Sequence, residues 1–211
     1  MIINPKQPPM KKPEIKHVIF DFGQVLVKFD PEYMCRQYLT NDSDVKTAAE
    51  ILFDRKYWDR LDAGTIEDEE LLGDAKERLP SHLREYAEKI YYGWIYNLPE
   101  IEGMRETVEL CKRKGYNVYL LSNISHYFAD RYEHIPILSS FDGFVFSAKA
   151  GCVKPSYEIF SHITKKFNLT PCQTLFIDDN ENNVKGADKF GIAAYHFDGD
   201  SKNLHNFISS L

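Results

Sequence analysis

The carboxylates that could carry chemistry stand at the ends of short apolar runs. Asp21 ends the run at residues 17–21, and the pair Asp178 and Asp179 follows the run at residues 175–177. Carboxylates close together repel one another unless a cation joins them, and their hard oxygen atoms favour Mg²⁺. A carboxylate can also act as a nucleophile and accept a phosphoryl group. These residues predict a magnesium site and phosphoryl-transfer chemistry.

Three other polar residues supply the groups that such a reaction needs. Ser122 and Asn123 follow the apolar run at residues 118–121, and Lys154 lies in the loop after the run at residues 144–146. A hydroxyl, an ammonium group and backbone N–H groups at a helix start can hold phosphoryl oxygens. Ser122 alone could cap a helix and Lys154 alone could lie on the surface. Their shared position after the runs predicts one common crevice.

The elements that must position these residues are predicted to be parallel strands. The apolar runs are nearly continuous, which is typical of strands covered by helices on both faces. They lie at residues 17–21, 118–121, 144–146, 175–177 and 192–195.

Segments with helical spacing separate the runs. Pro155 is expected at the first position of one such helix. We therefore predict an α/β fold with a doubly wound, parallel, five-stranded Rossmann-like core and an inserted all-helical cap.

Residues 31–98 differ from the rest of the chain. This segment has no strand-like run and is predicted to form three or four helices. It holds 15 acidic and 9 basic residues, whereas the remainder holds 17 of each, so all the net charge of −6 lies here. We divide the chain into a flexible tail (1–16), a core domain (17–30 and 99–211) and a helical cap domain (31–98).

Composition excludes several classes of protein. The net charge of −6 over 211 residues argues against a general nucleic-acid binder, and no apolar run is long enough to span a membrane. The four cysteines are far apart and are expected to be reduced thiols. We expect a cytoplasmic protein, monomeric or weakly dimeric, whose partner is a small phosphorylated substrate.

Four ordered motifs resemble those of the haloacid dehalogenase superfamily, which includes many small phosphatases. The motifs are VIFDFGQVL at residues 18–26, LSN at 121–123, VKP at 153–155 and FIDDNENN at 176–183. Their order and spacing match from residue 17 to about residue 196. The helical segment after the first motif matches the position of the cap in that family.

The resemblance implies a role for each matching residue. It implies that Asp21 is the nucleophile and that Lys154 pairs with Asp21 and with the phosphoryl group. It implies that Ser122 and the backbone of Asn123 hold the phosphoryl oxygens. For Mg²⁺, it implies a set of ligands and neighbours: Asp21, the backbone carbonyl of Gly23, Asp179 directly, Asp178 beside it, and Asn183 on a metal-bound water.

Gly23 is the one departure from the motif. Most phosphatases of the superfamily carry a second aspartate at this position, where it serves as general acid and base, a function worth ~10²–10⁴-fold in rate. Three explanations stay open. The leaving group could need little protonation, as in an acyl phosphate; an ordered water or a cap residue (Asp59, Arg60 or Asp62) could replace the aspartate; or the protein could chiefly bind phosphate with little turnover.

One subgroup with the same departure is the bacterial glucose-1-phosphate phosphatases. The segment YWDRLDAG at residues 57–64 resembles the cap loop of this subgroup. The resemblance implies a phosphatase that acts on a sugar phosphate, with the substrate selected by Trp58, Asp59, Arg60 and Asp62. The alternative is a metal-independent 2-haloacid dehalogenase, but those enzymes lack the paired aspartates of the fourth motif.

Overall fold

The computed structural model describes residues 14–211, and its centre is a parallel sheet of five strands in the order β3–β2–β1–β4–β5. The strands are β1 (His17–Phe20), β2 (Asn117–Ser122), β3 (Gly143–Phe146), β4 (Thr174–Asp178) and β5 (Ala193–His196). Phe20 of β1 lies between Leu120 of β2 and Ile177 of β4, so the three central strands end within about two residues of one another at the same edge of the sheet. The predicted fold class is confirmed.

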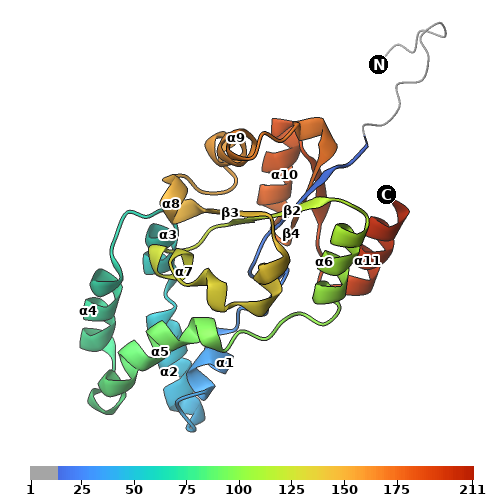
Figure 1. The fold of residues 1–211 in the computed structure, drawn as a ribbon. Helices are drawn as coiled ribbons and strands as arrows, with labels where there is room; N and C mark the ends of the chain where they lie inside the picture. Colours follow the sequence, from blue (N-terminus) through green and yellow to red (C-terminus); the bar gives the residue numbers. More distant parts are fainter. Residues whose placement is uncertain (1–13) are drawn as a thin grey trace, which may run out of the picture.

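Helices cover both faces of the sheet (Figure 1). One pair of these helices is α6 (Met104–Arg113) and α11 (Ser201–Ser210), and another is α9 (Tyr157–Lys166) and α10 (Glu181–Phe190). Side chains alternate across β1: Val18 belongs to the apolar cluster of the first pair, whereas Ile19 belongs to the cluster of the second. Both side chains are fully buried, which contributes ~1.5–3 kcal/mol each.

The start of α9 corrects one prediction. Pro155 is not the first helical residue; it lies in the preceding loop, after a cis peptide bond with Lys154. The helix begins at Tyr157 because the side chain of Ser156 caps it and accepts a hydrogen bond from the Ile159 amide.

The segment at residues 31–98, which we call the helical insert, contains more and shorter helices than predicted. The α-helices are α1 (Pro31–Arg36), α2 (Asp42–Leu52), α3 (Arg55–Asp62), α4 (Asp68–Arg78) and α5 (Ala87–Gly93), with 3₁₀ turns at Ser81–Tyr86 and Trp94–Tyr96. Asp30, Asn41 and Asp54 each accept a backbone N–H at a helix start, so these small polar residues begin α1, α2 and α3.

Aromatic side chains join the helical insert to the core. Trp58 of α3 stacks on Phe53 with ring centroids 5.3 Å apart, and Trp94 stacks on Phe128 of the core at 5.7 Å. Phe29, in the linker, packs edge-on against both tryptophans. The helical insert therefore shares one continuous apolar cluster with one side of the core.

The two linkers to the helical insert lie side by side. The Lys28 amide donates to the Pro99 carbonyl at 2.8 Å, and the Ile101 amide donates to the Leu26 carbonyl at 2.9 Å. The remaining short helices lie in the core: α7 (His126–Ala129), α8 (Ser147–Ala150) and the 3₁₀ turns Tyr132–His134, Pro136–Ser140 and Pro171–Gln173. No helix within residues 14–211 has the length and hydropathy needed to cross a bilayer.

Only the end of the expected tail falls within the described part. Residues 1–13 lie outside it. At residues 14–16 the chain already follows the sheet: the Lys16 amide donates to the Gln173 carbonyl at 2.8 Å, and Ile15 packs against the apolar cluster. The division of the chain into tail, core and cap domains stays a prediction.

Candidate active site

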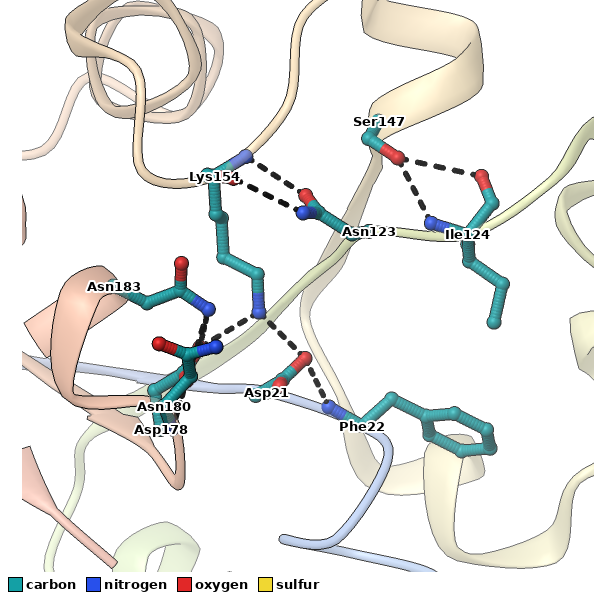
Figure 2. Close-up of polar contacts among 9 residues, drawn as sticks. All are labelled: Asp21, Phe22, Asn123, Ile124, Ser147, Lys154, Asp178, Asn180 and Asn183. Atoms are coloured by element: carbon teal, nitrogen blue, oxygen red, sulfur yellow. Dashed lines mark hydrogen bonds and ion pairs between the residues drawn. The ribbon is translucent and has the colours of Figure 1, made fainter. Parts of the chain in front are cut away.

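A buried lysine joins the carboxylates at the ends of two neighbouring strands. The Lys154 ammonium lies 2.7 Å from Asp21 Oδ1 and 2.7 Å from Asp178 Oδ2 (Figure 2). Asp21 directly follows β1 and Asp178 ends β4, and these two strands are paired. All three side chains are buried. The sheet thus brings together residues that are far apart in the sequence, as predicted from the strand ends.

Burial and the neighbouring charges raise the pKa values of both Asp21 and Lys154. Burial, the largest influence, raises the pKa of Asp21; the Lys154 ammonium opposes the rise and the Asp178 carboxylate adds to it. Burial by itself would lower the pKa of Lys154, but the two carboxylates outweigh burial and raise that pKa. Lys154 is therefore held in its charged form.

Two asparagines hold the buried charges in place. The side chain of Asn123 accepts from the Lys154 amide at 2.8 Å and donates to the Lys154 carbonyl at 3.1 Å. The Asn183 amide donates to both Asp178 oxygens at 3.0 and 3.1 Å, and the Asn180 backbone donates to Asp178 at 2.8 Å. Figure 2 shows these contacts on either side of the lysine. Asn123 and Asn183 are therefore positioning residues in this structure.

The donor set at the strand ends fits a magnesium ion. Asp21, Asp178 and Asp179 each offer one carboxylate oxygen within 4.8 Å of the others. The Lys154 ammonium pairs with two of these three carboxylates, so a divalent cation would balance the remaining charge. Burial and the charge of Asp178 raise the pKa of Asp179, which is the direction expected for crowded carboxylates.

The cation would be reached from a cavity of about 800 Å³. The core contributes the predicted residues to its wall: Asp21, Gly23, Ser122, Asn123, Lys154 and Asp179. Asp178 is fully buried behind this wall, where its oxygens are occupied by Lys154 and Asn183. Asp21 and Asp179 are thus better placed than Asp178 to be direct ligands, with the backbone of Gly23 beside them.

The helical insert contributes the opposite wall, but not every predicted residue reaches it. Trp58, Asp59 and Asp62 line the cavity. The indole N–H of Trp58 donates to the Leu52 carbonyl at 2.9 Å, which fixes the orientation of the ring. Arg60 is absent from this wall, and its guanidinium pairs with an exposed glutamate of α4 at 2.6 Å. Its position does not support a role in substrate selection.

A sequence profile of the haloacid dehalogenase-like hydrolases matches residues 15–191, which is most of the chain. The chain belongs to this family. The matched segment contains every strand except β5, and it contains all the residues of the cavity wall named above. The family resemblance drawn from the four motifs is confirmed.

Relatives of this hydrolase include two phosphatases. The chain is 26% identical over 192 residues to a D-ribitol-5-phosphate phosphatase from Bacteroides thetaiotaomicron, covering 86% of this chain and 91% of the relative. It is 24% identical over 185 residues to a sesquiterpene phosphatase from Aspergillus oryzae, covering 86% and 89%. Among solved structures, a mutant HAD family enzyme from B. thetaiotaomicron in complex with magnesium and inorganic phosphate has a TM-score of 0.62 at 23% identity, covering 86% and 93%.

Two residues of the hydrolase site were missed by sequence reasoning. Arg55 lines the cavity and pairs with Asp59 at 2.6 Å; its i,i+4 spacing from that aspartate was a usable signal. The Ser147 hydroxyl donates to the Asp62 carbonyl at 2.5 Å and accepts from the Ile124 amide at 2.8 Å. Ser147 and Asp62 are 85 positions apart, so no local pattern could have indicated their contact.

Proposed function

We propose that this hydrolase is a magnesium-dependent phosphatase that acts on a small phosphorylated metabolite. The observation that carries the proposal is the buried Lys154 ammonium, held between Asp21 and Asp178, with a third carboxylate near them in the wall of the cavity. The phosphatases among the relatives support the same reaction class.

Asp21 is the proposed nucleophile. The Lys154 ammonium and the Phe22 amide, each at 2.7 Å, both contact Oδ1 of this aspartate. Oδ2 receives no hydrogen bond from residues 14–211, so its lone pairs are available. Attack of an Asp21 oxygen on phosphorus breaks the bond to the leaving oxygen and forms an aspartyl phosphate, which water then hydrolyses to regenerate the carboxylate.

The remaining residues of the core wall bind the transferred group. Lys154 supplies a fixed positive charge, and Ser122, which is buried and lines the cavity, supplies a hydroxyl donor. Such preorganised donors stabilise charge that develops on the phosphoryl oxygens. A magnesium ion held by Asp21, Asp179 and the Gly23 carbonyl would neutralise further negative charge.

The size of the cavity and the relatives support the proposed substrate class. A volume of about 800 Å³ is within the usual range for small-molecule sites. The relative that acts on ribitol 5-phosphate favours a sugar or polyol phosphate. The expectation of a glucose-1-phosphate phosphatase stays a prediction, as do the cytoplasmic location, the absence of nucleic-acid and membrane partners, and the monomeric or weakly dimeric state.

A metal-independent 2-haloacid dehalogenase is the rival reaction. That chemistry needs no divalent cation, whereas this site gathers three carboxylates of which the Lys154 ammonium pairs with two. A phosphate-binding protein with little turnover is the other rival, and only Gly23 favours it.

The deciding experiment measures product release from purified protein with Mg²⁺ or with EDTA. The panel contains p-nitrophenyl phosphate, acetyl phosphate, ribitol 5-phosphate and glucose 1-phosphate, with 2-chloropropionate as the dehalogenase substrate. We expect phosphate release that needs Mg²⁺ and disappears in Asp21→Asn. Chloride release in EDTA, or no phosphate release from any compound, would overturn the proposal.

A further inference from the structure

We propose that Asp62, in the helical insert, is the general acid and base that takes the place of the aspartate absent at Gly23. This inference rests on the proposed phosphatase function and deepens it. Asp62 is the last residue of α3, and it lines the same cavity as Asp21 and Lys154.

The carboxyl group of Asp62 is buried but has no partner within residues 14–211. Asp62 is 9% exposed, and its side chain makes no hydrogen bond or ion pair in the described part of the chain. No fully buried side-chain oxygen or nitrogen of this part lacks a hydrogen-bond partner. The Asp62 oxygens must therefore be accessible, and the space they adjoin is the cavity.

The backbone around Asp62 is fixed to the core, which gives the carboxyl group a defined position. The Ser147 hydroxyl donates to the Asp62 carbonyl at 2.5 Å. Two residues later, Gly64 has φ +67°, and a Cβ at this glycine would come within 2.8 Å of the Ala148 carbonyl oxygen. The turn after α3 thus lies directly against α8, and a larger residue at position 64 would separate them.

The other two replacements that the sequence offered are less suitable. Asp59 also lines the cavity, but 61% of its side chain is exposed and it pairs with Arg55 at 2.6 Å. Arg60 pairs with Glu70 outside the cavity wall. A general acid needs an available proton near the leaving group, and Asp62 alone of the three combines burial, cavity contact and a free carboxyl group.

The electrostatic surroundings of Asp62 suit this role. Burial, the largest influence, raises its pKa to about 7; the charge of Asp59 adds to the rise, while Arg55 and Lys154 oppose it. His126 of α7 lies beside Gly64, where the turn after α3 meets α8. Asp21 and Asp179 line the cavity from the core. A carboxyl group with a pKa near neutrality can both donate and accept a proton at physiological pH.

The proton balance over the two half-reactions is simple. When Asp21 attacks phosphorus, the bond to the leaving oxygen breaks with its electron pair on that oxygen, and the Asp62 carboxyl group gives the oxygen its proton. The Asp62 carboxylate then removes a proton from water as the water oxygen attacks the aspartyl phosphate. Inorganic phosphate leaves, Asp21 is again a carboxylate, and Asp62 is again protonated.

Position 23 offers a direct way to test the replacement. Gly23 is not in the left-handed region, and a Cβ there would meet only the Phe29 Cβ at 3.8 Å, an ordinary contact. An aspartate can therefore be introduced at position 23 without backbone strain. If Asp62 replaces that aspartate, Gly23→Asp should compensate for the loss of Asp62.

The test compares Asp62→Asn with wild type on two kinds of phosphate ester. On ribitol 5-phosphate, whose leaving alkoxide needs a proton, kcat should fall by ~10²–10⁴-fold. On p-nitrophenyl phosphate, whose leaving group needs none, the first step stays fast and the second becomes slow. We expect a burst of about one equivalent of nitrophenolate followed by slow turnover, which a merely structural defect would not produce.

Three further variants make the result decisive. Asp68→Asn is the matched control: Asp68 is a half-buried carboxyl group of the helical insert whose pKa burial also raises, but it lies outside the cavity wall, so kcat should stay within about twofold. Asp62→Ser is measured in parallel, so that the effect of losing the carboxyl group can still be measured if one of the two variants folds poorly. Gly23→Asp combined with Asp62→Asn should regain at least about tenfold in kcat.

The outcomes separate this inference from the proposed function. Inactivity of the wild-type protein on every phosphate would overturn the phosphatase itself. An active wild type with an Asp62→Asn variant that keeps kcat on ribitol 5-phosphate within about threefold would overturn the role of Asp62 alone. Equal losses on both substrates without a burst, and without rescue by Gly23→Asp, would overturn it as well.

Discussion

The hydroxyl of Ser147 donates a hydrogen bond of 2.5 Å to the backbone carbonyl of Asp62, and so links the core to the helical insert at the edge of the cavity. The same hydroxyl accepts from the Ile124 amide, one residue after Asn123. One buried side chain therefore links the segment after β2, which we propose binds phosphate, to the wall that carries the proposed general acid.

Ser147→Ala should weaken both stability and turnover. It leaves the Ile124 amide and the Asp62 carbonyl without this partner, so the free energy of unfolding should fall by about 1–3 kcal/mol. Turnover of ribitol 5-phosphate should fall because the Asp62 backbone is no longer held. Chemical denaturation and steady-state kinetics measure the two effects. Ser139→Ala is the control, because within residues 14–211 that exposed serine bonds only to the Pro136 carbonyl.

Lys154→Met should be strongly destabilising in the absence of metal. It leaves the buried Asp21 and Asp178 carboxylates without their counter-charge, which costs about 3–5 kcal/mol. The measurement is chemical denaturation in EDTA. Lys149→Met is the control, because Lys149 and its partner Asp130 are both exposed. It should lower the free energy of unfolding by less than about 1 kcal/mol. Equal costs for the two variants would contradict the buried ion-pair network.

Magnesium should stabilise the protein through Asp179. A ligand that binds only the folded state adds about 2.7 kcal/mol at one hundred times its dissociation constant. We expect Mg²⁺ to raise the Tm of wild type and to have a much smaller effect on Asp179→Asn. The exposed Asp188→Asn on α10 serves as the control and should behave as wild type. An unchanged magnesium shift in Asp179→Asn would remove that carboxylate from the proposed ligand set.

Ionisation of Asp62 should lower the free energy of unfolding as the pH rises toward neutrality. Its folded pKa, about 7, lies above the ordinary value of 3.8, so the folded state binds the proton more tightly than the unfolded chain. The stabilisation is complete below pH 4 and is lost between about pH 4 and pH 7. Asp62→Asn stays neutral, and above pH 7 it should be more stable than wild type by ~1–4 kcal/mol.

That comparison requires thermal or chemical unfolding of both proteins at about pH 4.5, near the lower end of the ~3-unit window, and at about pH 8, above it. The difference between variant and wild type should grow with pH. A constant difference would show that Asp62 titrates normally in the folded protein. Asp68→Asn again provides a comparison within the helical insert.

Asp21→Asn should abolish turnover without unfolding the protein. The amide cannot form the aspartyl phosphate, while Lys154 keeps its contact with Asp178 at 2.7 Å. Phosphate release should fall below detection, and circular dichroism should match wild type. Full activity in this variant would place the nucleophile elsewhere.

The sequence alone was sufficient for the core and for the groups at its strand ends. Nearly continuous apolar runs predict buried parallel strands, and the carboxyl ends of parallel strands share one edge of the sheet. This rule predicts that Asp21, Ser122, Lys154 and Asp179 lie around one crevice. In the structure all four line one cavity. The four ordered motifs led to the hydrolase family, and the sequence profile confirmed it.

The tertiary structure decided which residues of the helical insert face that cavity. In the sequence, Asp59, Arg60 and Asp62 were equal candidates within one short helix, because helical spacing does not say which neighbours each side chain meets. Arg60 forms an ion pair with the exposed Glu70, whereas a hydrogen bond from Ser147 holds the backbone of Asp62 against the core. Contacts between residues so far apart in the chain depend on how two packed units meet, and no local pattern encodes that geometry.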